Sequence, residues 1–302
     1  MYLHVNITVT GATGFIGRYL VQSLARDGHS VRALSRAAWD ILAGEPPAES
    51  LAGADAVVHL AGSPVAKRWT RQAKKEIRAS RIEGTHHLVT ALSTLSQRPE
   101  VLVCASAIGI YGDRGDEVLT EASPVADGFL AGVCREWESE ADLAESLGVR
   151  VVKLRFGIAL GRSGGALERM LPPFRAFVGG RIGPGSQWMS WIYIADIVGL
   201  IRFAMDHPLN GAVNATAPNP LRNREFTREL AAVLHRPAIF PVPALALKIM
   251  FGEMADVLLA SQCVLPKAAE SAGYRFAFPE LGAALRDLSG KSAPLEARPG
   301  IL

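Results

Sequence analysis

A glycine-rich turn near the N-terminus constrains the fold of this chain more than any other feature. Val5–Thr10 predicts a β-strand and Phe15–Arg26 predicts a helix. Gly11 and Gly14 lie between these two elements, and Gly17 lies in the first turn of the helix. Gly11 permits a tight turn, Gly14 lets the backbone approach a pyrophosphate, and Gly17 lets the helix pack closely. Free N–H groups at the helix start attract an anion. This setting predicts dinucleotide binding, and the alternative is a turn kept only for packing.

The residues after the second predicted strand, Ser30–Leu34, indicate which dinucleotide is bound. Sites that prefer NAD usually carry an acid there, whereas this chain has Ser35 and Arg36. A guanidinium can pair bidentately with a 2′-phosphate, so we expect the cofactor to be NADP. A solvated loop arginine is the alternative. The expected cofactor contacts in this region are Gly11, Thr13, Gly14, Phe15, Ile16, Ser35 and Arg36.

Alternating strand and helix patterns continue through the first half of the chain. They predict right-handed crossovers and a Rossmann-type, doubly wound parallel sheet of the α/β class. The segment between the second and third strands, Ala37–Gly53, is short for a full crossover helix. The further predicted strands are Ala56–Leu60, Val101–Ala105 and Arg150–Leu154, and the further helices are about Thr70–Leu95, Leu130–Leu147, Tyr193–Met205 and Asn223–Leu234.

The second half is richer in proline and glycine. We expect an NADP-binding Rossmann domain over residues 1–160, to which some later segments return, and a smaller C-terminal α/β substrate domain over 161–290. Residues 291–302 read as a loosely ordered tail. The apolar run Ala238–Phe251 could be a lid, a dimer contact or part of the smaller core, and core burial is the default expectation.

Composition narrows the class of protein. The net charge of +3 on 302 residues comes from scattered basic side chains, so we expect no nucleic-acid partner. No apolar run reaches membrane-spanning length, and the N-terminus lacks a signal-peptide pattern. The three cysteines, Cys104, Cys134 and Cys263, have no metal-ligand spacing and fit a reducing compartment. We expect a cytoplasmic protein without a metal.

Several motifs together resemble a known group of enzymes. TGATGFIG at Thr10–Gly17, DAVVHLAG at Asp55–Gly62 and SAIGIYG at Ser106–Gly112 are similar to the extended short-chain dehydrogenase/reductases, which include nucleotide-sugar epimerases and dehydratases. Later motifs resemble the poorly characterised "epimerase family protein" branch, which has its own C-terminal segment, here about Pro237–Leu288. The motifs of that branch are LSR at Leu34–Arg36, KKEIRASR at Lys74–Arg81, LGRSGGAL at Leu160–Leu167 and SWIYIAD at Ser190–Asp196.

The resemblance implies further cofactor contacts. Leu60, Ala61 and Gly62 would line the adenosine side, and Ile158, with Gly157 before it, would meet the nicotinamide. Arg81 replaces an asparagine of the family's N-V-x-G-T motif, which implies that it faces the cofactor. Glu76 is considered as its partner, although the spacing is not an ideal helical one, and a surface ion pair is the alternative.

The catalytic residues depart from the family pattern. The usual chemistry needs a serine, a tyrosine and a lysine four residues after the tyrosine, and none of the five tyrosines here has that lysine. If Cys134 takes the tyrosine place, Glu138 takes the lysine place. Ser106 survives and would hydrogen-bond a substrate oxygen. Tyr111 could reach the same space or simply pack, and Cys134 reads as an inert thiol rather than a nucleophile.

On the substrate side, Gln187, Ser190 and the indoles of Trp188 and Trp191 could frame a polar, partly aromatic ligand or form a domain-joining turn. The sequence Lys67–Trp69 could contact an anionic substrate or be ordinary surface charge. Asp196 has no cation one helical turn away, so we expect it to cap or pair locally.

Two functions follow as expectations. The first is an NADP-dependent oxidoreductase or epimerase acting on a small hydroxylated or keto substrate, for which a sugar nucleotide is a fold-level analogy. Ser106 and Tyr111 are its candidate catalytic residues. The second is an NADP(H)-binding redox sensor or partner-binding module without turnover. The expected partners are a small-molecule substrate and, as one assembly, a homodimer, with no membrane.

Overall fold

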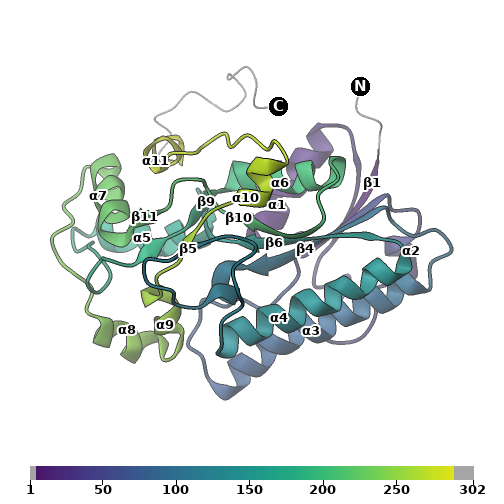
Figure 1. Ribbon diagram of the computed structural model, residues 1–302, viewed down its shortest axis with the longest axis horizontal. Coiled ribbons are helices and arrows are strands. Elements are labelled where there is room, and N and C mark those ends of the chain that lie inside the picture. Colours follow the sequence, from purple (N-terminus) through teal and green to yellow (C-terminus); the bar gives the residue numbers. More distant parts are fainter. Residues whose placement is uncertain (1–4, 289–302) are drawn as a thin grey trace. The chain divides into compact units, whose positions relative to one another are not determined.

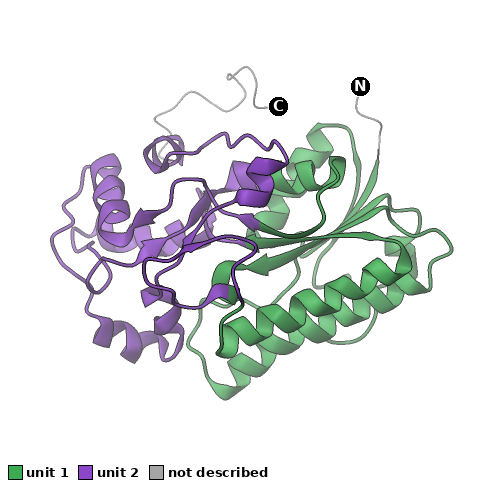
Figure 2. Cartoon of the chain, in the orientation of Figure 1, with its two compact units in different colours: residues 1–110, 125–155, 198–213 green, residues 111–124, 156–197, 214–302 purple. Residues whose placement is uncertain are grey.

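The computed structural model describes residues 5–288, and Figure 2 distinguishes its two compact units. Unit 1 comprises residues 1–110, 125–155 and 198–213, and unit 2 comprises 111–124, 156–197 and 214–302. The predicted domain borders at residues 160 and 290 stay a prediction. The tail predicted at 291–302 lies outside the described residues.

A six-stranded sheet organises unit 1. Its strands are β1 (Asn6–Thr10), β2 (Ser30–Leu34), β3 (Ala56–His59), β4 (Val101–Ala107), β6 (Arg150–Phe156) and β10 (Gly211–Ala215). Their order is β10-β6-β4-β3-β1-β2. β1 pairs in parallel with β2 and β3, and β3 pairs in parallel with β4. The predicted Rossmann-type parallel sheet is therefore confirmed.

Helices cover both faces of this sheet. They are α1 (Phe15–Arg26), α2 (Ala48–Leu51), α3 (Arg71–Ser93), α4 (Phe129–Asp142) and α6 (Ile194–Asp206). Figure 1 shows α3 and α4 side by side along one face and α1 on the other. All four residues of β3 are buried, and the first three are apolar, as is typical of a strand covered on both faces. The four-residue α2 confirms that the crossover between β2 and β3 is abbreviated.

The glycine turn brings α1 very close to the backbone that precedes it. Gly11 has φ of 66°, a left-handed conformation that glycine adopts without strain. A Cβ on Gly11 would lie 2.7 Å from the carbonyl carbon of Leu60, and one on Gly17 would lie 2.3 Å from the Gly11 oxygen. The predicted tight turn is confirmed. Gly17 allows the start of α1 to pack directly against the backbone of Gly11 and Ala12 in the turn.

Unit 2 is built from short paired strands and short helices. The pairs are β5 (Val118–Leu119) with β12 (Cys263–Val264), β7 (Ile158–Gly161) with β9 (Trp191–Tyr193), and β8 (Trp188–Met189) with β11 (Leu221–Arg222). The helices are α5 (Gly165–Arg175), α7 (Asn223–Leu234), α8 (Ala244–Phe251), α9 (Met254–Leu259), α10 (Lys267–Ser271) and α11 (Leu281–Leu288). Because these strands are short, many contacts between the elements of unit 2 are hydrogen bonds from side chains to backbone groups.

Asp196 illustrates how unit 2 is held together. Its carboxylate accepts the backbone N–H groups of Ala277 and Phe278 at 2.7 Å and 2.9 Å. Burial raises the pKa of Asp196 to about 6, and these hydrogen bonds oppose that rise. The expectation that Asp196 pairs locally therefore needs one correction, since its partners lie about eighty residues away in sequence.

The apolar run Ala238–Phe251 is not buried in a core, so the default expectation is wrong. Ile239, Phe240, Leu245, Ile249 and Met250 are 56% to 71% exposed, and Leu247 alone among the α8 residues is buried. The reason is geometric. A helix of eight residues that is apolar on nearly every side can bury only the side that meets the rest of unit 2.

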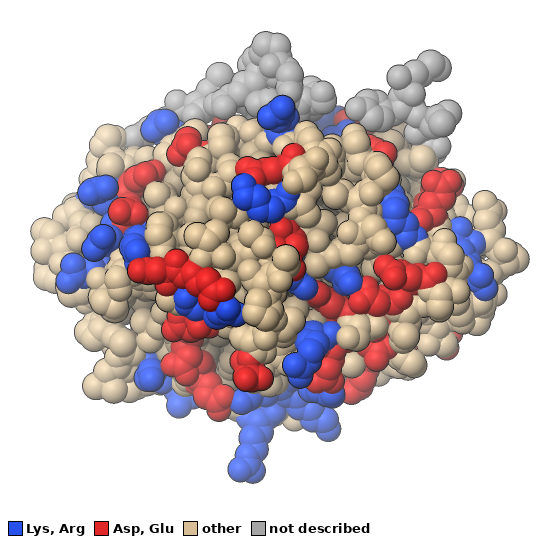
Figure 3. All heavy atoms as spheres, viewed as in Figure 1, with Lys and Arg blue, Asp and Glu red and all other residues tan. Residues whose placement is uncertain are grey.

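On the face drawn in Figure 3, positive and negative side chains are interspersed. This agrees, for that face, with the scattered charge expected from the sequence. Within residues 5–288, no helix combines the length and the apolar character needed to cross a membrane.

Replacing Gly17 by alanine should lower the free energy of unfolding by about 1–3 kcal/mol, because the new methyl group would meet the Gly11 carbonyl. Gly132→Ala in α4 is the matched control. Nothing lies within 4 Å of a Cβ there, so helix propensity should raise stability by about 0.5–1 kcal/mol. Urea unfolding of both variants measures the difference, and equal effects would contradict this account of the turn.

Candidate functional site

The candidate site in unit 1 lies at the carboxyl ends of the parallel strands. β2 and β3 pair with opposite sides of β1. Strand order therefore reverses at β1, and in open α/β sheets ligands bind in the crevice at such a point. The glycine turn follows β1, Ser35 and Arg36 follow β2, and Leu60–Gly62 follow β3. The sheet thus brings these predicted residues to one edge.

The start of α1 is open to a ligand. Gly14 is the N-cap residue and provides no side-chain cap for the first turn. Thr13 and Gly14 are exposed, whereas Phe15 and Ile16 are half-buried. Backbone N–H groups at a helix start carry a partial positive charge, so this end of α1 favours an anion.

Arg36 and Ser35 occupy the position that discriminates between dinucleotides. Arg36 is exposed directly after β2. The backbone carbonyl of Ser35 accepts the N–H groups of Ala38 and Trp39 at 3.1 Å and 3.0 Å, which fixes the turn that carries Arg36. The backbone of Arg36 is therefore held in a fixed turn, while its side chain is exposed to solvent.

The loop after β3 packs directly against the glycine turn. The Leu60 N–H donates to the Thr10 carbonyl at 3.3 Å. Arg81, on α3, donates to the Ser63 carbonyl at 3.0 Å and lies 3.5 Å from the position of a Cβ on Gly62. Its guanidinium also lies over the Trp137 ring, 5.1 Å from the centroid. Arg81 therefore supports the loop that carries Leu60, Ala61 and Gly62.

The expected pairing of Arg81 with Glu76 is wrong. The Glu76 carboxylate instead accepts Lys67 Nζ at 2.7 Å and Gln72 Nε2 at 3.0 Å. The hydrogen bond from Lys67, followed by that from Gln72, lowers the pKa of Glu76. Five residues along a helix place Arg81 and Glu76 too far around the axis to meet, and Lys67 is closer. Lys67 is thus explained by an ion pair on the surface.

The most unusual cluster in unit 1 joins Ser106, Glu138 and Arg155. Ser106 Oγ donates to Glu138 Oε1 at 2.6 Å. Arg155 donates through Nε to Oε1 at 2.8 Å and through a terminal nitrogen to Oε2 at 2.7 Å. All three residues are buried, and they come from β4, α4 and β6. The Glu138 carboxylate is therefore compensated by a bidentate guanidinium.

Sequence reasoning missed Arg155. The signal was present, since two basic residues, Lys153 and Arg155, interrupt the apolar residues of the buried strand RVVKLRF. A buried arginine needs an anionic partner, and Glu138 was the unexplained carboxylate. Lys153, two residues earlier on β6, pairs with Asp142, also on α4, so Lys153 and Arg155 both reach that helix.

Cys134 remains a protonated thiol. It is buried, and burial raises its pKa to about 12. Thiolate, not thiol, is the nucleophile of cysteine enzymes. The interpretation of Cys134 as an inert thiol is therefore favoured.

Tyr111 and Ile158 belong to unit 2. Tyr111 is fully buried and its hydroxyl donates to Asn214 Oδ1 at 2.7 Å, which fits the packing interpretation. The Ile158 N–H donates to the Ser190 carbonyl at 2.8 Å, and the N–H of Gly157 donates to Ala215. The catalytic role of Tyr111 and the cofactor contact of Ile158 stay predictions.

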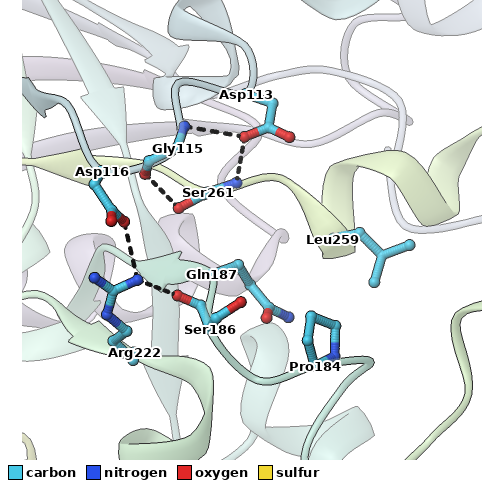
Figure 4. Close-up of a pocket in the computed structure, with 9 residues that line it drawn as sticks. All are labelled: Asp113, Gly115, Asp116, Pro184, Ser186, Gln187, Arg222, Leu259 and Ser261. Carbon is cyan, nitrogen blue, oxygen red and sulfur yellow. Dashed lines mark hydrogen bonds and ion pairs between the residues drawn. The ribbon is translucent and has the colours of Figure 1, made fainter.

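Unit 2 contains a polar cavity of about 440 Å³. Figure 4 shows its lining, in which Arg222 pairs with Asp116 at 2.9 Å, beside Asp113 and Ser261. Gln187 also lines it, and its Oε1 atom has no hydrogen-bond partner among the described residues. The lining is Asp113, Gly115, Asp116, Pro184, Ser186, Gln187, Arg222, Leu259 and Ser261.

Other residues expected on the substrate side have structural partners. Ser190 is fully buried, donates to the Gln262 carbonyl and accepts the N–H of Val264. The buried Trp191 indole donates to the Asn219 carbonyl. Trp69 is buried as well and donates to the Val65 carbonyl. Within residues 5–288, no group of His, Cys, Asp and Glu side chains could hold a metal ion.

Comparison with known families confirms the resemblance expected from the motifs. Residues 7–216 match the model of the NAD dependent epimerase/dehydratase family. Residues 242–288 match a separate domain of unknown function, DUF1731, in the region of the predicted C-terminal segment.

Relatives match along nearly the whole chain. The chloroplastic SDR39U1 homolog of Arabidopsis thaliana, an epimerase family protein, is 44% identical, covering 93% of this chain and 86% of that protein. YfhF of Bacillus subtilis is 38% identical, covering 94% and 98%. The crystal structure of human epimerase family protein SDR39U1 with NADPH has a TM-score of 0.87 at 34% identity, covering 95% of this chain and 100% of that one.

Removal of the Glu138 carboxylate should be strongly destabilising. Glu138→Ala removes the carboxylate that compensates the buried Arg155 charge, and we expect a loss of about 3–5 kcal/mol in the free energy of unfolding. Glu136→Ala, on the same helix, is the control, because the Glu136–Arg78 pair is 42% and 48% exposed. That loss should be about 0–1 kcal/mol. Similar losses in chemical denaturation would show that the Glu138–Arg155 pair is not a buried, compensated charge.

Proposed function

This chain belongs to the NAD dependent epimerase/dehydratase family, and from that membership we propose that it is an NADP(H)-dependent oxidoreductase or epimerase. Its substrate would be a small hydroxylated or keto compound. The observation that carries the cofactor assignment is the exposed Arg36 directly after β2, where NAD-specific sites usually hold an acid.

Three features of unit 1 fit a bound dinucleotide. The turn at Gly11 and Gly17 leaves no room for side chains, which packs the turn tightly against α1 and the loop after β3, while Gly14 between them is exposed. The uncapped start of α1 would receive the pyrophosphate, and Arg36 with Ser35 would hold the 2′-phosphate. The similar human protein was solved with NADPH, which supports the same choice of cofactor here.

The other predicted site residues have separate proposed roles. Leu60, Ala61 and Gly62 would line the adenosine side, with Arg81 as a positioning residue behind them. When bound, the nicotinamide would accept or return a hydride. Ser106 would hydrogen-bond the substrate oxygen. Tyr111 and Ile158 remain candidates contributed by unit 2.

The cavity in unit 2 offers a second place for polar groups of a ligand. The carboxylates of Asp113 and Asp116 on its lining are hydrogen-bond acceptors. Hydroxyl groups could satisfy them, which agrees with a hydroxylated substrate.

A second function has its own supporting observation. None of the five tyrosines has a lysine four residues later, and the residues we expect at those two places are a buried Cys134, whose pKa is raised to about 12, and an ion-paired Glu138. A protein that binds NADP(H) without turnover and reports redox state to a partner would need neither residue. We propose this as the alternative, with the homodimer as one candidate assembly.

The compartment is a further part of the proposal. The three cysteines are buried free thiols, which fit a reducing environment such as the cytoplasm. One similar plant protein is described as chloroplastic, so the thiols alone do not distinguish between reducing compartments.

Arg36→Ala should weaken NADPH binding about 10-fold to 100-fold and leave NADH binding nearly unchanged, because only NADPH carries the 2′-phosphate. Arg26→Ala, an exposed arginine in the last turn of α1, is the matched control and should change neither. Titration by nicotinamide fluorescence measures both constants. Equal affinity of the unaltered protein for NADH and NADPH would reject the assignment.

Turnover separates the two functions. The protein should oxidise NADPH, or reduce NADP⁺, with at least one member of a panel of carbonyl compounds, alcohols and sugar nucleotides. Ser106→Ala should reduce that rate by about 10²-fold or more while cofactor affinity is kept. Tight cofactor binding with no turnover across the panel would favour the redox-sensor alternative.

A further inference from the structure

The hydrogen bonds around Glu138 fix the direction in which Ser106 can act. A serine hydroxyl has one proton to donate and two lone pairs to accept with. The Arg155 guanidinium is permanently charged and occupies both Glu138 oxygens, at 2.8 Å and 2.7 Å. This pairing matches an ionised carboxylate, which only accepts hydrogen bonds. The 2.6 Å contact therefore uses the proton of Ser106.

The remaining capacity of Ser106 Oγ is as an acceptor. A ligand that meets this oxygen must bring an O–H or N–H group. A carbonyl oxygen cannot donate a hydrogen bond, so its lone pairs would face the lone pairs of Ser106 Oγ. It could bind favourably only if Ser106 gave up its buried hydrogen bond to Glu138. Such charge-assisted bonds are among the stronger ones in proteins, so the existing direction is the favoured one.

Ser106 lies at the edge of the sheet that carries the proposed site. It is the penultimate residue of β4, at the carboxyl edge of the sheet, two strands from β1 and its glycine turn. Glu138 and Arg155 approach it from α4 and β6, within the same unit. The arrangement differs from a surface ion pair because all three side chains are buried.

We propose that Glu138 and Arg155 are positioning residues that hold Ser106 as a hydrogen-bond acceptor and thereby select a hydroxyl compound over the corresponding carbonyl compound as the bound substrate. This selection rests on the proposed function and names its substrate class. It assigns binding of the substrate in its alcohol form to Ser106. Arg155 acts by pairing with both oxygens of Glu138, and Glu138 acts by accepting the hydrogen bond of the Ser106 hydroxyl.

Glu138→Gln should reverse the selection. With the amide oxygen at the Oε2 position it can still accept from the terminal nitrogen of Arg155, and the amide NH₂ group at the Oε1 position can donate to Ser106, while Arg155 Nε loses its acceptor there. The serine proton then becomes free to point to a ligand. We expect alcohol binding to weaken and ketone binding to strengthen, each by about 5-fold to 10-fold. Glu136→Gln, exposed on the same helix, should change neither.

The measurement uses matched pairs of probes: cyclohexanol with cyclohexanone, propan-2-ol with acetone, and benzyl alcohol with benzaldehyde. Alcohols are titrated into protein saturated with NADPH and carbonyl compounds into protein saturated with NADP⁺, because neither combination can react. Ligand-observed NMR gives the dissociation constants. Comparison of each variant with the unaltered protein removes the effect of the different cofactor form.

Each result decides the proposal. Opposite changes for alcohol and ketone in Glu138→Gln support it. A parallel loss of both, or an unaltered protein that prefers the ketones or binds no probe, overturns it. If Glu138→Gln does not fold, Ser106→Ala replaces it and should weaken alcohols alone. Failure to bind NADPH in a prior titration would reject the proposed function instead, and the probes are then titrated without cofactor, where the same criteria apply.

Discussion

The buried pair of Glu138 and Arg155 is the interaction on which the candidate site depends. A carboxylate placed between a helix and a sheet would be very costly without a charged partner. Arg155 supplies that partner with two parallel hydrogen bonds, and Ser106 completes the set. The pair ties α4, β6 and β4 together at the edge where the glycine turn also lies. It therefore explains how this chain tolerates a buried acid at position 138.

The two halves of the unit 1 site are built differently. The proposed cofactor side is made of backbone, because side chains are excluded at Gly11 and Gly17 and the loop after β3 is held by Arg81. The proposed substrate side is made of three buried side chains, Ser106, Glu138 and Arg155, whose hydrogen bonds have a fixed direction. Because the two halves share few residues, a change in one can leave the other intact. Binding and catalysis are thus separate questions for this protein.

The sequence predicted what depends on local pattern. The strand, turn and helix around Gly11, the strand before Ser35, and the family itself followed from spacing and motif. Partners distant in sequence were missed. Arg155 lies 17 positions after Glu138, and Glu76 meets Lys67 rather than Arg81. Exposure of the apolar α8 was also missed, because burial depends on how much surface the surrounding unit offers and not on hydrophobicity alone.

The most direct test of the central claim is to locate one hydrogen atom. Neutron diffraction from deuterated crystals shows where the exchangeable deuterium of Ser106 lies. We predict deuterium on Ser106 Oγ, directed at Glu138 Oε1, and neither oxygen of Glu138 carrying one. Deuterium on the Glu138 carboxyl group, or a serine hydroxyl directed away from it, would contradict the account.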